Sequence, residues 1–245
     1  MRGWLAWGGV ALVLLFGTGA AALAVQPLSP QQVLKAFEDR VFVALPGSSE
    51  KMVLKWQRPV RFGLVSREGV SSALYARTLG DIEAIRQVTG KDFLVSSDKI
   101  NFLVLFSRDT DADVKAYGRE IAPFFSDGID YHGFFQSYER EGLTCAGKML
   151  LSPTHEIIAY LLFVSVPGER GPAAVDYCIA RNLLRGMGVI AEPSAGTGAA
   201  LGRPGGAAFT PLDQEVLRIL YSTLIKSGEP EKTAARTVQR LAAGS

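Results

Sequence analysis

The chain has 245 residues, a formal net charge of +2 and 48% hydrophobic residues. This near-neutral charge lacks the excess of lysine and arginine that binds nucleic acid non-specifically, so nucleic acid is not an expected partner. After the N-terminal stretch, no apolar run reaches the roughly 20 residues of a membrane-spanning helix, which excludes a multi-span membrane protein.

The N-terminus has the three parts of a secretory signal. Arg2 precedes an apolar stretch over 4–16, and an Ala-Leu-Ala cleavage sequence follows. We therefore expect residues 1–24 to be a signal peptide and 25–245 to form one domain, either periplasmic or secreted. The alternative is that residues 4–24 stay uncleaved and anchor the protein in the inner membrane.

Hydrophobic periodicity and capping residues predict the elements of the first half of the chain. Ser29 and Pro30 are typical of a helix start, and Gly90 of a helix end. In chain order we expect a helix over 29–45, a strand over 55–66, a helix over 71–90, strands over 92–97 and 100–107, and a helix over 111–125 capped by Asp111.

The second half is expected to begin with a β-hairpin, because two apolar runs flank a Pro-Thr turn. In chain order we expect strands over 146–152 and 156–166, a helix over 171–189, a Gly-rich linker over 191–208, and helices over 210–228 and 229–244. Five strands and several helices favour an α+β (α/β-like) fold. It would have a single mixed sheet of about five strands, packed by helices, with further helices at the C-terminus.

The chain has two cysteines, Cys145 and Cys178. An even count in an exported protein favours one disulfide. The alternative is a pair of buried free thiols.

Residues 154–160 read Thr-His-Glu-Ile-Ile-Ala-Tyr, which is close to the zinc-hydrolase motif His-Glu-x-x-His. Ala159 stands where the second histidine is required, and the stretch runs into a β-branched strand rather than a helix. A three-ligand zinc site would need both His132 and His155, with a carboxylate such as Asp130 or Glu156, and nothing in the spacing assembles that set. We expect no metal and no other cofactor.

Several segments, taken together and in order, resemble the domain-of-unknown-function 2927 family of bacterial exported proteins. Its helix reads roughly Cys-x-x-Glu-Glu-Leu-x-Gln-x-Leu-Gly-Leu, and here Cys178, Leu183, Gly186, Met187, Gly188 and Val189 match it. The other pieces are 54–65, 87–90, 100–106, Cys145 and 210–228. The resemblance covers roughly residues 30–243.

That family is similar to zincin metalloproteases in layout, which implies a mixed sheet followed by the helix that would carry the metal motif. By position, the three motif residues fall on Arg181, Asn182 and Arg185, where the family usually has Glu, Glu and Gln. Guanidinium has no lone pair for a metal, and asparagine cannot act as a carboxylate base. The resemblance therefore implies a zincin-like domain without catalytic residues.

Three functions remain open at this stage. The first is a non-catalytic domain that binds a protein partner or a small anionic ligand, with Arg181, Asn182 and Arg185 in the binding cleft. For the two arginines the simpler interpretation is a solvated face whose stems pack on neighbouring residues, and the anion-binding patch is the sharper alternative. The second is a hydrolase with an unrecognised site, using carboxylates such as Glu139, Glu141 or Asp213. The third is a structural envelope protein anchored by its N-terminal segment.

Overall fold

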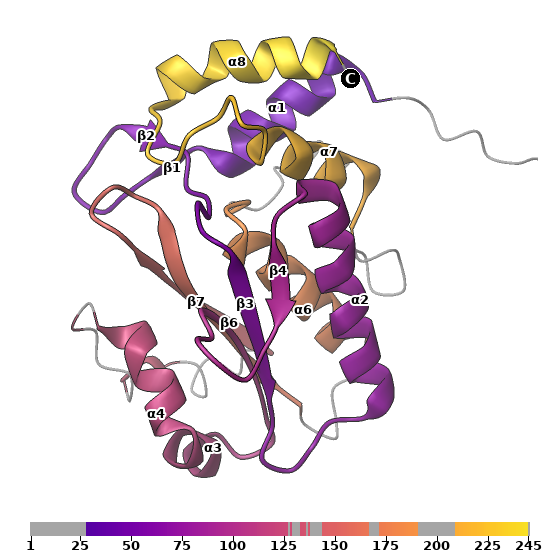
Figure 1. Ribbon diagram of the computed structural model, residues 1–245, viewed down its shortest axis with the longest axis vertical. Helices are drawn as coiled ribbons and strands as arrows, with labels where there is room; N and C mark the ends of the chain where they lie inside the picture. Colours follow the sequence, from indigo (N-terminus) through magenta and orange to yellow (C-terminus); the bar gives the residue numbers. More distant parts are fainter. Residues whose placement is uncertain are drawn as a thin grey trace, which may run out of the picture.

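The computed structural model describes residues 28–126, 128, 133–135, 137, 144–166, 172–190 and 209–244. The expected signal peptide, the Gly-rich stretch 191–208, Asp130, His132, Glu139 and Glu141 lie outside these residues. The described part is built around a five-stranded mixed sheet packed by helices (Figure 1), which confirms the predicted architecture.

The strands of the central sheet are β3 (Val60–Val65), β4 (Phe93–Val95), β5 (Phe102–Ser107), β6 (Cys145–Leu151) and β7 (Ile157–Ser165). Their order is β4-β3-β5-β7-β6, with the first four parallel and β6 antiparallel to β7 at one edge. Every residue of β5 is buried, as its continuous apolar run predicted. A small antiparallel pair, β1 (Val43–Ala44) and β2 (Lys51–Met52), was not predicted, because two residues carry no periodicity.

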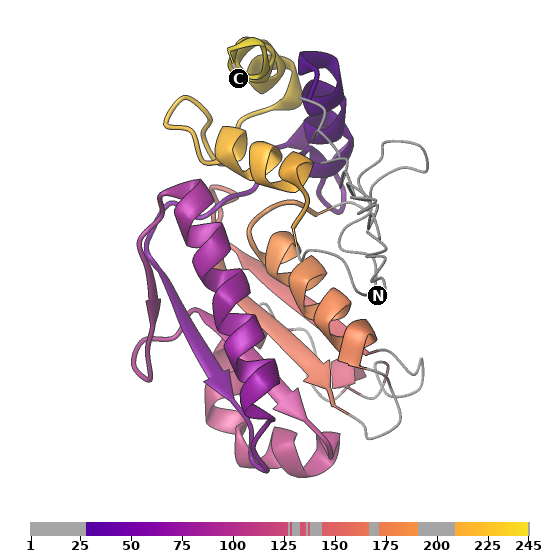
Figure 2. The same cartoon turned by 90° about the vertical axis from the view of Figure 1, so that its right-hand side faces the viewer.

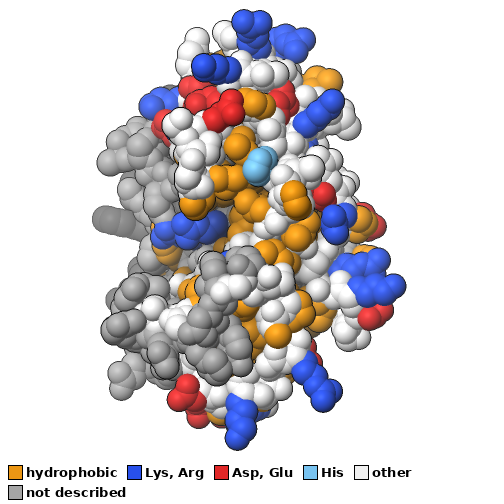
Figure 3. Space-filling model, turned by 90° about the vertical axis from the view of Figure 1, so that its left-hand side faces the viewer, with side chains coloured by type: hydrophobic (Ala, Val, Ile, Leu, Met, Phe, Trp, Pro, Cys, Tyr) orange, Lys and Arg blue, Asp and Glu red, His pale blue; other side chains and the backbone are white. Residues whose placement is uncertain are grey.

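The helices are α1 (Pro30–Val41), α2 (Ser72–Thr89), α3 (Thr110–Ala116), α4 (Gly118–Ile121), the 3-10 helix η1 (Ala122–Phe125), α6 (Pro172–Gly186), α7 (Pro211–Leu220) and α8 (Glu231–Ala243). Figure 2 shows α2 and α6 side by side over one face of the sheet, with α1, α7 and α8 beyond one end. On the opposite face lie α3, α4 and η1, and hydrophobic side chains gather across the middle of that side (Figure 3).

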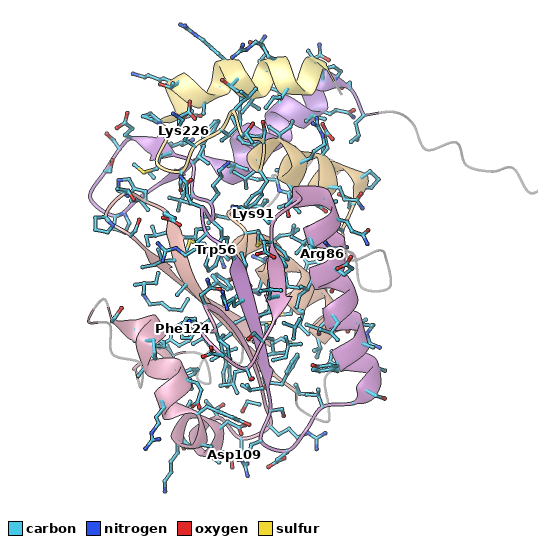
Figure 4. The ribbon with its side chains drawn as sticks, viewed as in Figure 1. Trp56, Arg86, Lys91, Asp109, Phe124 and Lys226 are labelled. Atoms are coloured by element: carbon cyan, nitrogen blue, oxygen red, sulfur yellow. A yellow bond between two sulfur atoms is a disulfide. The ribbon has the colours of Figure 1, made fainter. Side chains whose placement is uncertain are left out.

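Two hydrophobic clusters separate along the two faces of the sheet because successive strand side chains point to opposite sides. Phe102, Tyr160 and Leu162 pack towards the helices. Leu103 and Phe163 pack on the opposite face with the segment that includes Phe124, labelled in Figure 4. The sheet is therefore buried on both faces over much of its width.

The predicted helix starts are mostly confirmed. Ser29 and Thr210 each accept a backbone hydrogen bond in a capping box, and both are followed by proline at the first helical position. The cap predicted at Asp111 is wrong: Asp109 caps α3, and the predicted helix over 111–125 is divided into α3, α4 and η1.

The predicted end of the 210–228 helix is also wrong, since α7 ends at Leu220. The physical reason is Lys55, whose ammonium group donates to the carbonyls of Leu220 and Ser222 at 3.0 and 3.1 Å. These are carbonyls left without partners by the end of the helix, and a buried lysine from a distant segment satisfies them. Burial lowers the pKa of Lys55 to about 8.

The carboxylate of Asp81 on α2 is partly buried and lies near a second carboxylate, Asp176 on α6. Burial raises the pKa of Asp81 to about 7; the nearby Asp176 carboxylate raises it further, while Arg77 opposes the shift. Between pH 3.8 and 7 the folded state therefore holds a proton that the unfolded state has released. The free energy of unfolding must fall as the pH rises through this window.

We expect Asp81→Asn to remove this loss. Relative to wild type, the variant should gain about 1–2 kcal/mol of stability between pH 4.5 and 7, after allowance for the partial exposure of the carboxyl group. Urea denaturation at several pH values measures the difference. Glu83→Gln is the control, because Arg86 lowers the pKa of Glu83 from 4.5 to about 2, so the contribution of Glu83 to stability changes with pH only below about 4.5 and is constant between pH 4.5 and 7. Parallel curves for Asp81→Asn and wild type would contradict the assignment.

Candidate anion-binding groove between β6 and α6

The near-motif at 154–160 does not lie on a helix. His155 is in the turn between β6 and β7, with a φ of 62°, and Ile157 begins β7. Glu156 forms an ion pair with Arg58 at 3.1 Å. The prediction that this stretch is a strand start and not a zinc-hydrolase helix is confirmed.

A disulfide joins Cys145, the first residue of β6, to Cys178 in the second turn of α6. The predicted bridge is therefore present, and the alternative of two free thiols is wrong. Gly147 lies against Asn182, two residues further along β6 and four further along α6. The edge strand and the helix thus run in the same direction, with the disulfide as their link.

A groove of about 540 Å³ follows this line between strand and helix. Six of the lining residues recur on α6 at spacings of three and one, which places them on one face of the helix. The lining is Thr144, Cys145, Ala146 and Gly147 from the strand side and Ala174, Tyr177, Cys178, Arg181, Asn182 and Arg185 from α6. The three residues that the sequence assigned to a cleft are therefore brought together.

Asn182 forms part of the floor of the groove and is only 7% exposed. Its side-chain oxygen accepts from the Tyr160 hydroxyl at 3.2 Å, and its amide nitrogen donates to the Cys178 carbonyl at 2.9 Å. Burial raises the pKa of Tyr160, so the hydroxyl stays a donor. With both ends of its amide engaged, Asn182 supports the floor of the groove.

Gly147 is required because β6 passes directly over this floor. A Cβ atom at this position would overlap the Tyr160 hydroxyl and lie 2.9 Å from the Asn182 side-chain oxygen. We expect Gly147→Ala to destabilise the protein by about 1–3 kcal/mol, because the clash is with a buried, hydrogen-bonded pair. Thermal or urea unfolding measures it.

Gly80→Ala is the matched control, since a Cβ added at Gly80 on α2 meets nothing within 4 Å. It should stabilise the protein by about 0.5–1 kcal/mol through helix propensity alone. If both substitutions shift stability in the same direction, the close approach at Gly147 is not the controlling feature.

The two arginines differ in exposure. Arg185 is exposed and makes no hydrogen bond or ion pair with the part of the chain that the structure describes. Arg181, by contrast, is half-buried and already interacts with another residue. Both guanidinium groups act electrostatically on the buried Tyr160, which places their charge over the floor of the groove. None of the described residues that line the groove is acidic. The groove therefore carries positive charge at one end.

The C-terminal end of α6, which sets the position of Arg185, is held by the segment before β3 and by the end of α7. The indole of Trp56, which is labelled in Figure 4, donates to the Gly186 carbonyl at 2.7 Å, and the Tyr221 hydroxyl donates to the Met187 carbonyl at 3.0 Å. Gly188 has a φ of 97°, and a Cβ there would overlap the Leu54 carbonyl. Position 188, in the turn after α6, therefore accepts only glycine.

The carboxylate proposed for a hydrolase, Asp213, is not available for catalysis. It is fully buried, receives hydrogen bonds from the Thr210 backbone and hydroxyl, and lies 2.6 Å from the Arg40 guanidinium. Across the described ranges, no group of three His, Cys, Asp or Glu residues is placed to hold a metal ion.

The sequence matches no protein-family model, no curated protein and no solved structure. None of the helices that the structure describes is both long and apolar enough to cross a membrane.

Sequence reasoning missed the strand side of the groove and Tyr177. One signal was present: a bridge from Cys145 to Cys178 places β6 against α6, and strand alternation then places Gly147 on the same face as Cys145. Tyr177 precedes Cys178, and nothing in the sequence indicated that it borders a groove.

Proposed function

We propose that this protein is a non-catalytic, exported domain that binds an anionic group in the groove between β6 and α6. The observation that carries the proposal is a pair of guanidinium groups one helical turn apart on the wall of that groove. Arg185 is free of partners among the described residues, so it can donate to a ligand without first losing an ion pair.

The chemistry of the wall favours an anion over a metal ion. Guanidinium groups stay protonated and offer only donors, in a fork that fits carboxylate and phosphate. The C-terminal end of a helix disfavours an anion by about 0.3–1 kcal/mol. A hydrogen bond from a charged donor contributes about 1.5–3 kcal/mol, so one such bond from Arg185 already outweighs the helix end.

The same arrangement supports a distant relationship to zincins through the domain-of-unknown-function 2927 family. A mixed sheet is followed directly by a helix, and the motif positions on that helix lie on the wall of a groove. In this proposal the groove is retained while Arg181, Asn182 and Arg185 replace the metal-binding and base residues. The disulfide is typical of an oxidising compartment and supports export.

Binding of inorganic phosphate, measured by isothermal titration calorimetry, tests the proposed function. We expect Arg185→Gln to weaken phosphate binding by about tenfold, as one charged contact is lost. Arg240→Gln on α8, an exposed position far from the groove, removes the same charge and should have no effect. Equal losses in both variants would mean that only overall charge matters. Tightly bound, stoichiometric zinc or iron in protein purified without a His tag would overturn the proposal.

A further inference from the structure

The groove is polarised along its length. Its α6 wall begins with Ala174, Tyr177 and the disulfide sulfur of Cys178, and ends with Arg181 and Arg185. From Ala174 to Arg185 the helix advances about 16 Å at 1.5 Å per residue. One half of the wall is therefore apolar and aromatic, and the other half is cationic.

The strand side of the groove has the same polarity. Thr144, Cys145 and Ala146 border the half that contains the disulfide, whereas Gly147 borders the half that contains Asn182. Gly147 brings no side chain, and the space where its Cβ would lie is filled by the Tyr160 hydroxyl and the Asn182 side chain of the floor. The Asn182 amide is engaged by Tyr160 and Cys178, so the charged donor offered to a ligand in this half is the exposed guanidinium of Arg185.

We propose that the ligand is an anionic amphiphile, in which a carboxylate or phosphate head lies at Arg185 and an apolar chain lies along Tyr177 and the disulfide. This inference rests on the proposed function and goes further by naming the ligand class. A fully polar anion would leave the apolar half in water, and a neutral apolar ligand would have to be placed beside unneutralised guanidinium charge. Only a ligand with both parts matches both halves of the groove.

Acetate, octanoate and 1-octanol are the probes, because they separate the contribution of the anionic head group to binding from that of the apolar chain. Backbone amide chemical shifts follow each titration and can measure weak binding. Each buried methylene tightens binding by about fourfold, and the groove is open on one side, so we expect octanoate to bind at least about tenfold more tightly than acetate. Octanol should bind more weakly than octanoate by about tenfold.

Two substitutions assign the two halves. Tyr177→Ser should remove most of the advantage of octanoate while leaving acetate binding unchanged. Arg185→Gln should weaken both acids and leave octanol unchanged. Tyr75→Ser is the control for the tyrosine, since Tyr75 is 39% exposed on α2 and does not line the groove.

The outcomes separate this inference from the function on which it rests. Equal, Arg185-dependent binding of acetate and octanoate would overturn the amphiphile and leave the anion site in place. Octanol that binds as tightly as octanoate, with no effect of Arg185→Gln, would overturn both. If neither acetate nor octanoate binds, both the amphiphile proposal and the proposed anion site are overturned.

Discussion

Arg40→Met is expected to destabilise the fold more than any other single substitution considered for this protein, by about 3–5 kcal/mol. Arg40 on α1 and Asp213 on α7 are both fully buried, and their closest atoms lie 2.6 Å apart. The contact is ionic rather than an aligned hydrogen bond, and the Arg40 Nε and Nη1 atoms are buried without partners. Truncation of Arg40 leaves the Asp213 carboxylate buried without its counter-charge.

The double variant Arg40→Met/Asp213→Asn is the informative comparison. It removes both charges while keeping a side-chain oxygen that can accept from Thr210 at the start of α7. Desolvation of a buried ion pair costs much of the free energy that the attraction between its charges provides. The double variant should therefore recover at least half of the stability that Arg40→Met loses. Urea denaturation of both single variants and the double variant gives the coupling energy. Additive losses would show that the pair does not act as a unit.

The second large effect is expected on removal of the disulfide. The bridge closes a loop with a sequence separation of 33 residues, so Cys145→Ser/Cys178→Ser should lower the free energy of unfolding by about 3–4 kcal/mol. The effect comes mainly from the unfolded chain, which gains conformational freedom when the loop is opened. Urea denaturation under oxidising conditions measures the difference from wild type.

Reductant supplies the control for this prediction. Wild type in excess reductant should fall to the stability of the double-serine variant, whereas the variant itself should not respond. If wild type keeps its full stability after both thiols have been shown to be free, the bridge does not contribute to the fold.

The fold was largely predictable because its signals are local. The capping pairs Ser29-Pro30 and Thr210-Pro211 are recognisable in the sequence, and the continuous apolar run of β5 indicates a central strand. The end of α7 was not predictable, because it depends on Lys55, which lies 165 residues away in the sequence from Leu220. Long-range hydrogen bonds of this kind leave no local pattern.

The candidate site was predictable only in part. The positions of Arg181 and Arg185 one turn apart follow from helical spacing, but their partner wall depends on the Cys145–Cys178 bridge. The hydrogen bond between Asn182 and Tyr160 was not predictable, since it requires β7 to lie beneath α6. Helical spacing identifies which side chains share a face, but not which of them already make hydrogen bonds within the protein.

The most direct test of the central claim is a titration of the ¹⁵N-labelled protein with inorganic phosphate, observed at the side-chain Nε–H of Arg185 and the backbone amide of Gly147. An anion held in the groove should shift both signals in a saturable manner with one dissociation constant, while the Nε–H of Arg240 on α8 does not move. Shifts of similar size at all exposed arginines, or none at Arg185, would contradict the claim that α6 presents an anion site in place of a metal site.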